Sequence, residues 1–169
     1  MSLPFTVRAA RTSDVPAIKS LVEPLADQRI LMAKETVAYY EGLPEFRIAA
    51  DDDGEVLGCG ALHVMWEDLA EVRTLATSPA ARGRGVGSAL VEELLQQARD
   101  FGVDRVFCLT FEVEFFRRHG FEVMADQSAV DPQIYSELLR SHDEGVAEFL
   151  DLARVKPNTL GNTRMIRRL

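Results

Sequence analysis

A strand (69–77), a glycine-rich loop and a long amphipathic helix (86–101) follow one another, and no other feature of the chain constrains the fold as strongly. In the helical segment the apolar residues recur at three- and four-residue spacing, which is typical of a helix that buries one face. Gly102 supplies the expected stop for this helix. A nearly continuous apolar run from 103 to 110 then predicts a second, buried strand. Because a helix separates these two strands, we predict a parallel crossover between them.

The flanking segments predict further strands and helices around this unit. Residues 46–50 and 56–62 flank Asp51-Asp52-Asp53-Gly54, whose Asp-Gly step suits the tight turn of an antiparallel hairpin. Other strands or extended segments are predicted at 5–8, 146–152 and 165–169. Other helices are predicted after Ser13 or Asp14, with Pro24 bending or shortening the first one, and at 34–41, 111–119 and 132–140. A mixed sheet flanked by helices follows.

Composition narrows the class of protein. The 169 residues suit one globular domain, 1–169, and the formal charge of -8 argues against a general nucleic-acid binder. We expect no contact with a membrane and a cytoplasmic location, because the chain has no apolar run of spanning length and Met1–Thr6 lacks the start of a secretory signal. Cys59 and Cys108 lie in apolar runs and are predicted to be reduced core thiols. No bound metal is expected.

The loop from Arg82 to Gly87 has the features of an anion site. Its three alternating glycines let the backbone turn tightly and present amide N–H groups at the start of the following helix. The helix end and the two arginines favour a diphosphate by roughly 0.3–1 kcal/mol each when exposed. A nucleotide-triphosphate loop would need Gly-Lys followed by Ser or Thr, and a dinucleotide fingerprint would need its third glycine at Ser88. Both alternatives fail on spacing.

This loop resembles the cofactor loop of the GNAT superfamily of N-acetyltransferases, with Arg82, Gly85 and Gly87 at the matching positions. The strand 72–79 and the segment 115–121 are similar to two further motifs of that family, and the likeness covers roughly residues 5 to 124. It implies an α+β (mixed α/β) fold with a mixed, mostly antiparallel central sheet flanked by helices, and acetyl-CoA as co-substrate. The cofactor-binding residues implied are Leu75, Ala76, Thr77, Arg82, Gly83, Arg84, Gly85, Val86, Gly87, Ser88 and Phe116.

Acetyl transfer to an amine requires a base, a donor to the thioester carbonyl and a stable leaving thiolate. Glu71, on the strand expected beside the thioester, is the candidate base, acting directly or through water. A backbone N–H near Leu75 is the candidate carbonyl donor. Many family members carry a tyrosine acid where this chain has Phe116, so a water or the free thiolate takes that role here. His63 and His119 are alternative acid–base residues.

Within the superfamily the chain is most similar to short amino-acid acetyltransferases of the N-acetylglutamate synthase type. The segments 28–31, 58–62, 70–76 and 156–165 carry this resemblance. It implies acetyl transfer to the α-amine of glutamate or glutamine, the first step of arginine biosynthesis. A dicarboxylate substrate needs cationic anchors, preferably the fork of arginine, and an acidic protein must supply them locally. The available substrate-binding residues are Arg29, Arg73, Lys156, Asn158 and Arg164.

Other interpretations stay open at this point. The same fold could acetylate another small amine or a protein N-terminus. It could also be a CoA-binding regulatory module without catalysis, for which Phe116 is the main support. A small amino acid is the expected partner, and a homodimer is an open alternative to the monomer.

Overall fold

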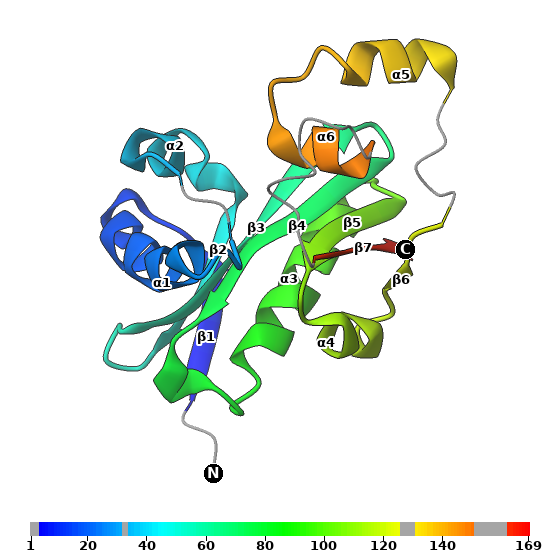
Figure 1. Cartoon of the computed structure of the whole chain (residues 1–169). Helices are drawn as coiled ribbons and strands as arrows, with labels where there is room; N and C mark the ends of the chain where they lie inside the picture. The colour runs from blue at the N-terminus through cyan, green and yellow to red at the C-terminus, as the bar shows by residue number, and fades with distance from the viewer. Residues whose placement is uncertain (1–3, 32–33, 126–130, 151–161) are drawn as a thin grey trace.

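A seven-stranded sheet forms the centre of the protein, which a computed structural model describes over residues 4–31, 34–125, 131–150 and 162–169. Its spatial order is β1-β2-β3-β4-β5-β7-β6 (Figure 1). The strands are β1 (Phe5–Ala9), β2 (Phe46–Asp51), β3 (Val56–Trp66), β4 (Leu69–Thr77), β5 (Arg105–Thr110), β6 (Glu122–Val123) and β7 (Thr163–Arg168). Among the described strands only β4 and β5 pair in parallel, and the other five pairings are antiparallel. The predicted mixed, mostly antiparallel sheet with one parallel crossover is therefore confirmed.

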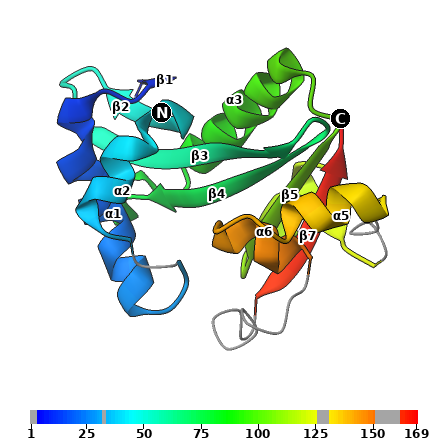
Figure 2. The same ribbon diagram turned by 90° about the horizontal axis from the view of Figure 1, so that it is seen from above.

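Helices cover both faces of this sheet. The α-helices are α1 (Val15–Asp27), α2 (Thr36–Glu41), α3 (Val86–Phe101), α4 (Val113–Arg118), α5 (Pro132–Leu138) and α6 (Glu144–Phe149), with short 3₁₀ turns η1 (Thr12–Asp14), η2 (Leu43–Glu45) and η3 (Pro79–Ala81). Figure 2 shows α3 on one side of the sheet and α1, α2, α5 and α6 on the other. None of the described helices is both long enough and apolar enough to cross a membrane.

Side-chain alternation along β4 explains these two layers. Ala70 and Val72 belong to the apolar cluster under α3, whereas Leu69 packs on the opposite face with Phe107 and Phe149. The α3 stripe predicted from the sequence is buried from Leu90 to Ala98, with leucines 90, 94 and 95 at 0 % exposed, whereas Phe101 at the end of the helix is 59 % exposed. Burial of each such side chain stabilises the fold by about 1.5–3 kcal/mol. The central strand is thus held from both sides.

Most predicted elements are confirmed. The hairpin turns at Gly54, and Gly102 ends α3 in the left-handed conformation, with φ of +83° at both glycines. Cys59 and Cys108 are buried free thiols. The first helix continues through Pro24 to Asp27, because a proline in the last turn removes only one backbone donor.

The extended segment predicted at 146–152 is wrong, because residues 144–149 form helix α6. Asp143 starts this helix, since its Oδ1 accepts hydrogen bonds from the backbone N–H of Gly145 and Val146 at 2.8 and 3.3 Å. The Arg164 guanidinium, from β7, donates to the carbonyls of Glu148 and Phe149 at the other end. Side chains therefore bond the free backbone groups at both ends of α6, and one of these side chains, Arg164, comes from β7.

Arg29 follows the end of α1 with a left-handed backbone, φ 59°. Its N–H bonds to Ala26 O at 2.9 Å, and the N–H of Ile30 bonds back to Leu25 O at 2.8 Å. This closing turn favours glycine, because only glycine avoids the clash of Cβ in that conformation.

We expect Arg29→Gly to raise the free energy of unfolding by about 1 kcal/mol, because it removes this backbone strain. Arg29→Ala keeps the Cβ and is the matched control, for which we expect no gain. Urea unfolding of the three proteins measures the difference. A glycine variant less stable than the alanine variant would contradict the backbone explanation.

Candidate active site

The loop between β4 and α3 presents unpaired backbone donors. Gly83 and Gly85 both have φ of +78°, and Gly85 caps α3 without a side chain. Within the part of the chain that the structure describes, the N–H groups of Val86, Gly87 and Ser88 have no acceptor. They point out of the first turn of a 16-residue helix, where the helix dipole also favours an anion. The predicted anion site therefore has the required geometry.

Helix α4 packs against this loop through Phe115. A Cβ built on Gly87 would lie 3.5 Å from Phe115 Cζ, so the ring covers the glycine directly. Phe116, predicted to contact the cofactor, is instead only 5 % exposed and stacks edge-on against Phe121 in the core, with ring centroids 5.2 Å apart. The aromatic side chain at the loop is therefore Phe115. A direct contact of Phe116 with a cofactor stays a prediction.

Strands β4 and β5 separate soon after they start. Their parallel ladder contains only the pairs Leu69–Arg105, Ala70–Val106 and Glu71–Phe107. Beyond this point β5 pairs with β7 alone, and Figure 2 shows β4 and β5 diverging. No described strand pairs with this edge of β4 after Glu71. An unpaired edge can accept an extended ligand as an additional strand.

A bulge changes the direction of β4 next to this open edge. Three residue steps of β4, from Arg73 to Ala76, span two steps of β3. Thr74 has φ of 56°, an outlier for a β-branched residue. As a result Leu75 packs on the α3 side, whereas Ala76 packs on the α1 side. The bulge therefore re-aims the backbone at Leu75, the predicted carbonyl donor.

Glu71 lies at the last residue pair before the strands separate. It is 4 % exposed, and its Oε2 is buried without a hydrogen-bond donor from the described residues. Burial raises the pKa of Glu71 to about 8, with Arg73 opposing this and Glu148 and Asp143 adding to it. Gly145 of α6 covers the carboxylate so closely that a Cβ there would meet Oε2 at 1.8 Å. Such a group can take a proton from a bound ligand.

A charged cluster surrounds Glu71 on this face of the sheet. Arg73 Nη1 bonds to Asp143 Oδ2 at 2.9 Å, and its Nη2 lies 3.8 Å from Glu45 Oε2. His63 Nδ1 contacts Glu45 Oε1 at 2.6 Å, and its Nε2 lies 3.5 Å from Asp143 Oδ2. Burial raises the pKa of Asp143, but Arg73 outweighs it and lowers that pKa overall. Arg73 is thus already neutralised by two carboxylates.

Lys34 and Glu148 complete the charged cluster from opposite sides. Lys34 Nζ donates to Thr74 Oγ1 at 3.3 Å, and burial and the nearby Arg73 lower its pKa. Lys34 makes no ion pair with a described carboxylate. On α6, burial and then Glu144 and Asp143 raise the pKa of Glu148 to about 7. Lys34 is therefore a cation at this site that can still bind a carboxylate.

The predicted substrate-binding residues are only partly brought together. Arg73 lies beside Glu71, and Arg164 lies at the end of α6. Arg29 is exposed, and no hydrogen bond or ion pair within the described residues links its side chain to Glu71 or Arg73. Lys156 and Asn158 lie outside the described residues.

Sequence reasoning missed four residues of the charged cluster: Lys34, Glu45, Asp143 and Glu148. Each comes from a different element or loop than β4, and none belongs to a recognisable motif. Only Asp143 carried a local signal, because an aspartate before a helical segment is a typical cap. Among the described residues, no group of three or more His, Cys, Asp or Glu side chains could hold a metal ion.

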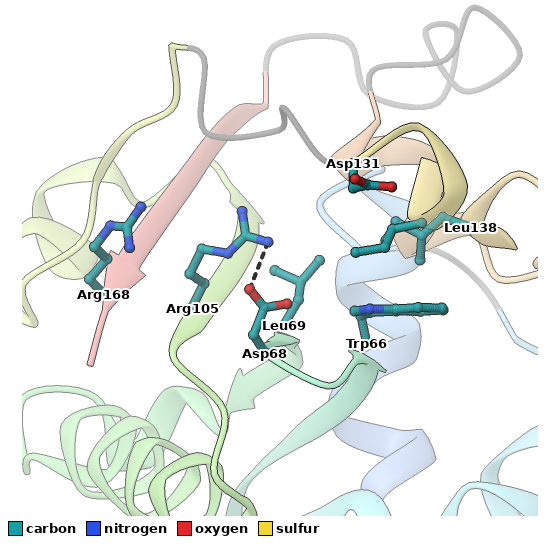
Figure 3. A pocket seen from close by; sticks show the side chains of 8 residues that line it. Trp66, Asp68, Leu69, Arg105, Asp131, Leu138 and Arg168 are labelled. Atoms are coloured by element: carbon teal, nitrogen blue, oxygen red, sulfur yellow. Dashed lines mark ion pairs between the residues drawn. The ribbon is translucent and has the colours of Figure 1, made fainter. Parts of the chain in front are cut away.

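A separate pocket of about 300 Å³ contains none of the predicted site residues. It is lined by Trp66, Asp68, Leu69, Arg105, Asp131, Ile134, Leu138 and Arg168. In Figure 3 Arg105 reaches Asp68, with Nη2 3.1 Å from Oδ2, while Trp66 and Leu138 face them across the pocket. It lies at the closed end of the β4–β5 pair, away from the glycine-rich loop.

Comparisons with known proteins agree with this geometry. The sequence profile of the family described as "Acetyltransferase (GNAT) family" matches residues 18–121. The chain is 56% identical over 162 residues to a Mycobacterium tuberculosis protein named amino-acid acetyltransferase, covering 95% of this chain and 92% of that protein.

Two solved structures are similar in fold. A Mycobacterium tuberculosis protein in complex with CoA and NLQ superposes with a TM-score of 0.92 at 55% identity, covering 97% of this chain and 99% of that one. N-acetylglutamate synthase from Neisseria gonorrhoeae, complexed with coenzyme A and N-acetyl-glutamate, gives a TM-score of 0.77 at 26% identity. That alignment covers 100% of this chain but 36% of the synthase, so the chain spans about a third of it.

Proposed function

The chain belongs to the acetyltransferase (GNAT) family, and on this premise we propose that it transfers the acetyl group of acetyl-CoA to the α-amine of glutamate or glutamine. The observation that carries the proposal is Glu71, a buried carboxylate whose Oε2 has no hydrogen-bond donor among the described residues, at the point where β4 and β5 separate. The names of the Mycobacterium and Neisseria proteins support an amino-acid acceptor. This reaction is the first step of arginine biosynthesis.

The cofactor site follows from β4 and the loop after it. The free N–H groups of Val86, Gly87 and Ser88 suit the pyrophosphate, and the unpaired edge of β4 suits the extended pantetheine arm. One strand thus leads from the anion site to Glu71, so the thioester would lie beside the carboxylate. The predicted contacts of Leu75, Ala76, Thr77, Arg82, Gly83 and Arg84 are part of this proposal.

The chemistry needs a neutral amine. We assign the removal of the ammonium proton to Glu71, whose free Oε2 is an acceptor and whose raised pKa makes it a stronger base than an exposed glutamate. The amine nitrogen then bonds to the thioester carbon, the C–S bond breaks, and the thiolate leaves and takes up a proton. The backbone N–H of Leu75, after the bulge, is the donor assigned to the carbonyl oxygen.

Lys34 is the anchor that we assign to the acceptor's carboxylate. Arg73 was predicted for this role, but Asp143 and Glu45 already neutralise it. Lys34 Nζ lies beside Thr74, within the electrostatic reach of Glu71, and has a hydroxyl rather than a carboxylate as its partner. A substrate carboxylate would give this partly buried ammonium the countercharge that it lacks.

The proposed reaction can be tested by CoA release from acetyl-CoA with glutamate, glutamine, other amino acids and a polyamine. We expect turnover with glutamate or glutamine to exceed that with the other amines by tenfold or more, on the order of 1.4 kcal/mol or above. Turnover with the polyamine alone would contradict the specificity. Tight acetyl-CoA binding without any turnover would instead favour the regulatory module.

The base assignment predicts a specific pH dependence. Glu71 acts only when deprotonated, and its pKa is raised from 4.5 to about 8, so the rate ratio between wild type and Glu71→Gln should rise with pH up to about 8. At that pH we expect the variant to be slower by about 100-fold or more. Glu67→Gln, in the exposed β3–β4 turn, is the matched control. Equal rates of wild type and Glu71→Gln from pH 6 to 9 would remove Glu71 as the base.

Lys34→Met should raise the KM for the amino acid by about 10- to 100-fold, because one charge-assisted bond is lost. The KM for acetyl-CoA should change far less, and Lys34→Arg should recover most of the affinity. Lys19→Met, which removes a lysine that pairs with Glu23 on α1, is the control. Equal changes in both KM values would place Lys34 outside the acceptor site.

A further inference from the structure

Three side chains form a hydrogen-bonded chain at the first turn of α3. Ser88 and Glu92 are four residues apart, so they lie on the same face of the helix. His119, at the end of α4, contacts both: its Nδ1 lies 2.8 Å from Glu92 Oε1, and its Nε2 lies 3.1 Å from Ser88 Oγ. None of the chemistry assigned to Glu71 uses these three hydrogen-bonded side chains.

The imidazole of His119 is held in one position. Its side chain is 11% exposed, and the ring packs on Phe115 with centroids 4.9 Å apart. Arg167 of β7 donates a hydrogen bond to the backbone carbonyl of His119. The Arg118 guanidinium lies over the Phe115 ring, the same ring on which the imidazole packs. The charged groups around the imidazole are therefore Glu92 from α3, Arg118 from α4 and Arg167 from β7.

The direction of these bonds follows from the acceptor at one end. A carboxylate only accepts, so Nδ1 of His119 must donate to Glu92. Ser88 lies in the same turn as the unpaired amide donors of the cofactor loop. For its hydroxyl to donate to an anion there, its oxygen must accept from Nε2–H, which requires the imidazolium form.

We propose that Glu92 and His119 are positioning residues that orient the Ser88 hydroxyl toward the pyrophosphate of acetyl-CoA, so that the protein selects donors carrying this group. This inference rests on the cofactor site of the proposed function. With His119 donating from both ring nitrogens, an unbroken series of hydrogen bonds runs from Glu92 through His119 and Ser88 to the phosphate oxygen. His119 thus serves the cofactor rather than the acyl transfer.

The test compares acetyl-CoA with S-acetylpantetheine, which has the same thioester without the pyrophosphate. His119→Gln should lower kcat/KM for acetyl-CoA about tenfold, the loss of one charge-assisted bond, and leave kcat/KM for S-acetylpantetheine unchanged. The kcat at saturating acetyl-CoA should stay within about twofold. Glu92→Gln should lower kcat/KM for acetyl-CoA in the same direction, and Glu93→Gln, at an exposed neighbour of Glu92 on α3, is its matched control.

Ser88→Ala and the double variant Ser88→Ala/His119→Gln test whether Ser88 and His119 act together. Ser88→Ala should equal His119→Gln, and combining them should add no further loss. If His119→Gln fails to fold, Ser88→Ala still decides, because alanine favours the helix at that position. Equal losses with both donors, or no loss with either, would overturn the proposal.

Calorimetry of CoA binding gives an independent measurement that needs no acceptor. His119→Gln should weaken CoA binding about tenfold, the loss of one charge-assisted bond, and Glu93→Gln should leave it unchanged. Wild type that binds CoA no more tightly than His119→Gln overturns the inference alone, whereas wild type that does not bind CoA overturns the proposed function as well.

Discussion

The limited pairing between β4 and β5 is the constraint on which the site depends. After Glu71–Phe107 the two strands separate, and the described part of β4 has one edge without a partner. An unsatisfied sheet edge is unfavourable unless a ligand or another element covers it. The opening is held by packing on both sides: α3 fills one face beneath β4, while Phe107 and Phe149 fill the other beside β5. The two strands are thus held together by pairing and packing up to Glu71, and beyond it the edge of β4 can accept a ligand.

Electrostatics at this opening depend on α6, which belongs to the C-terminal part of the chain. Asp143 both caps the helix and bonds Arg73, so a single carboxylate places α6 on β4. That placement buries Glu71 and brings Glu148 near it. Two carboxyl groups with raised pKa values next to a neutralised arginine form a site that, once deprotonated, can accept a proton, which suits a reaction that begins with deprotonation of an ammonium.

Strand β4 joins the two ends of the site, and the two ends use different kinds of groups. At its exit, β4 leads into the amide donors of α3, and α4 packs there through Phe115 and His119. At the bulge, Thr74 stores backbone strain beside Lys34. The proposed cofactor site is therefore built from backbone donors at a helix start and a hydroxyl group, whereas the proposed acid–base site is built from buried charge.

The sequence by itself determined most of the elements and the glycine-rich loop. Local rules were enough for α3 and for the turn glycines, because spacing, caps and positive-φ positions are properties of neighbouring residues. The charged cluster was decided only in the tertiary structure, since Lys34, Glu45 and Asp143 reach Arg73 or Thr74 across long sequence separations. Helix α6 was mistaken for an extended segment for the same reason, because a cap from β7 helps to hold it. Pairing between distant residues, which no local pattern encodes, neutralises Arg73 and leaves Lys34 without a carboxylate partner among the described residues.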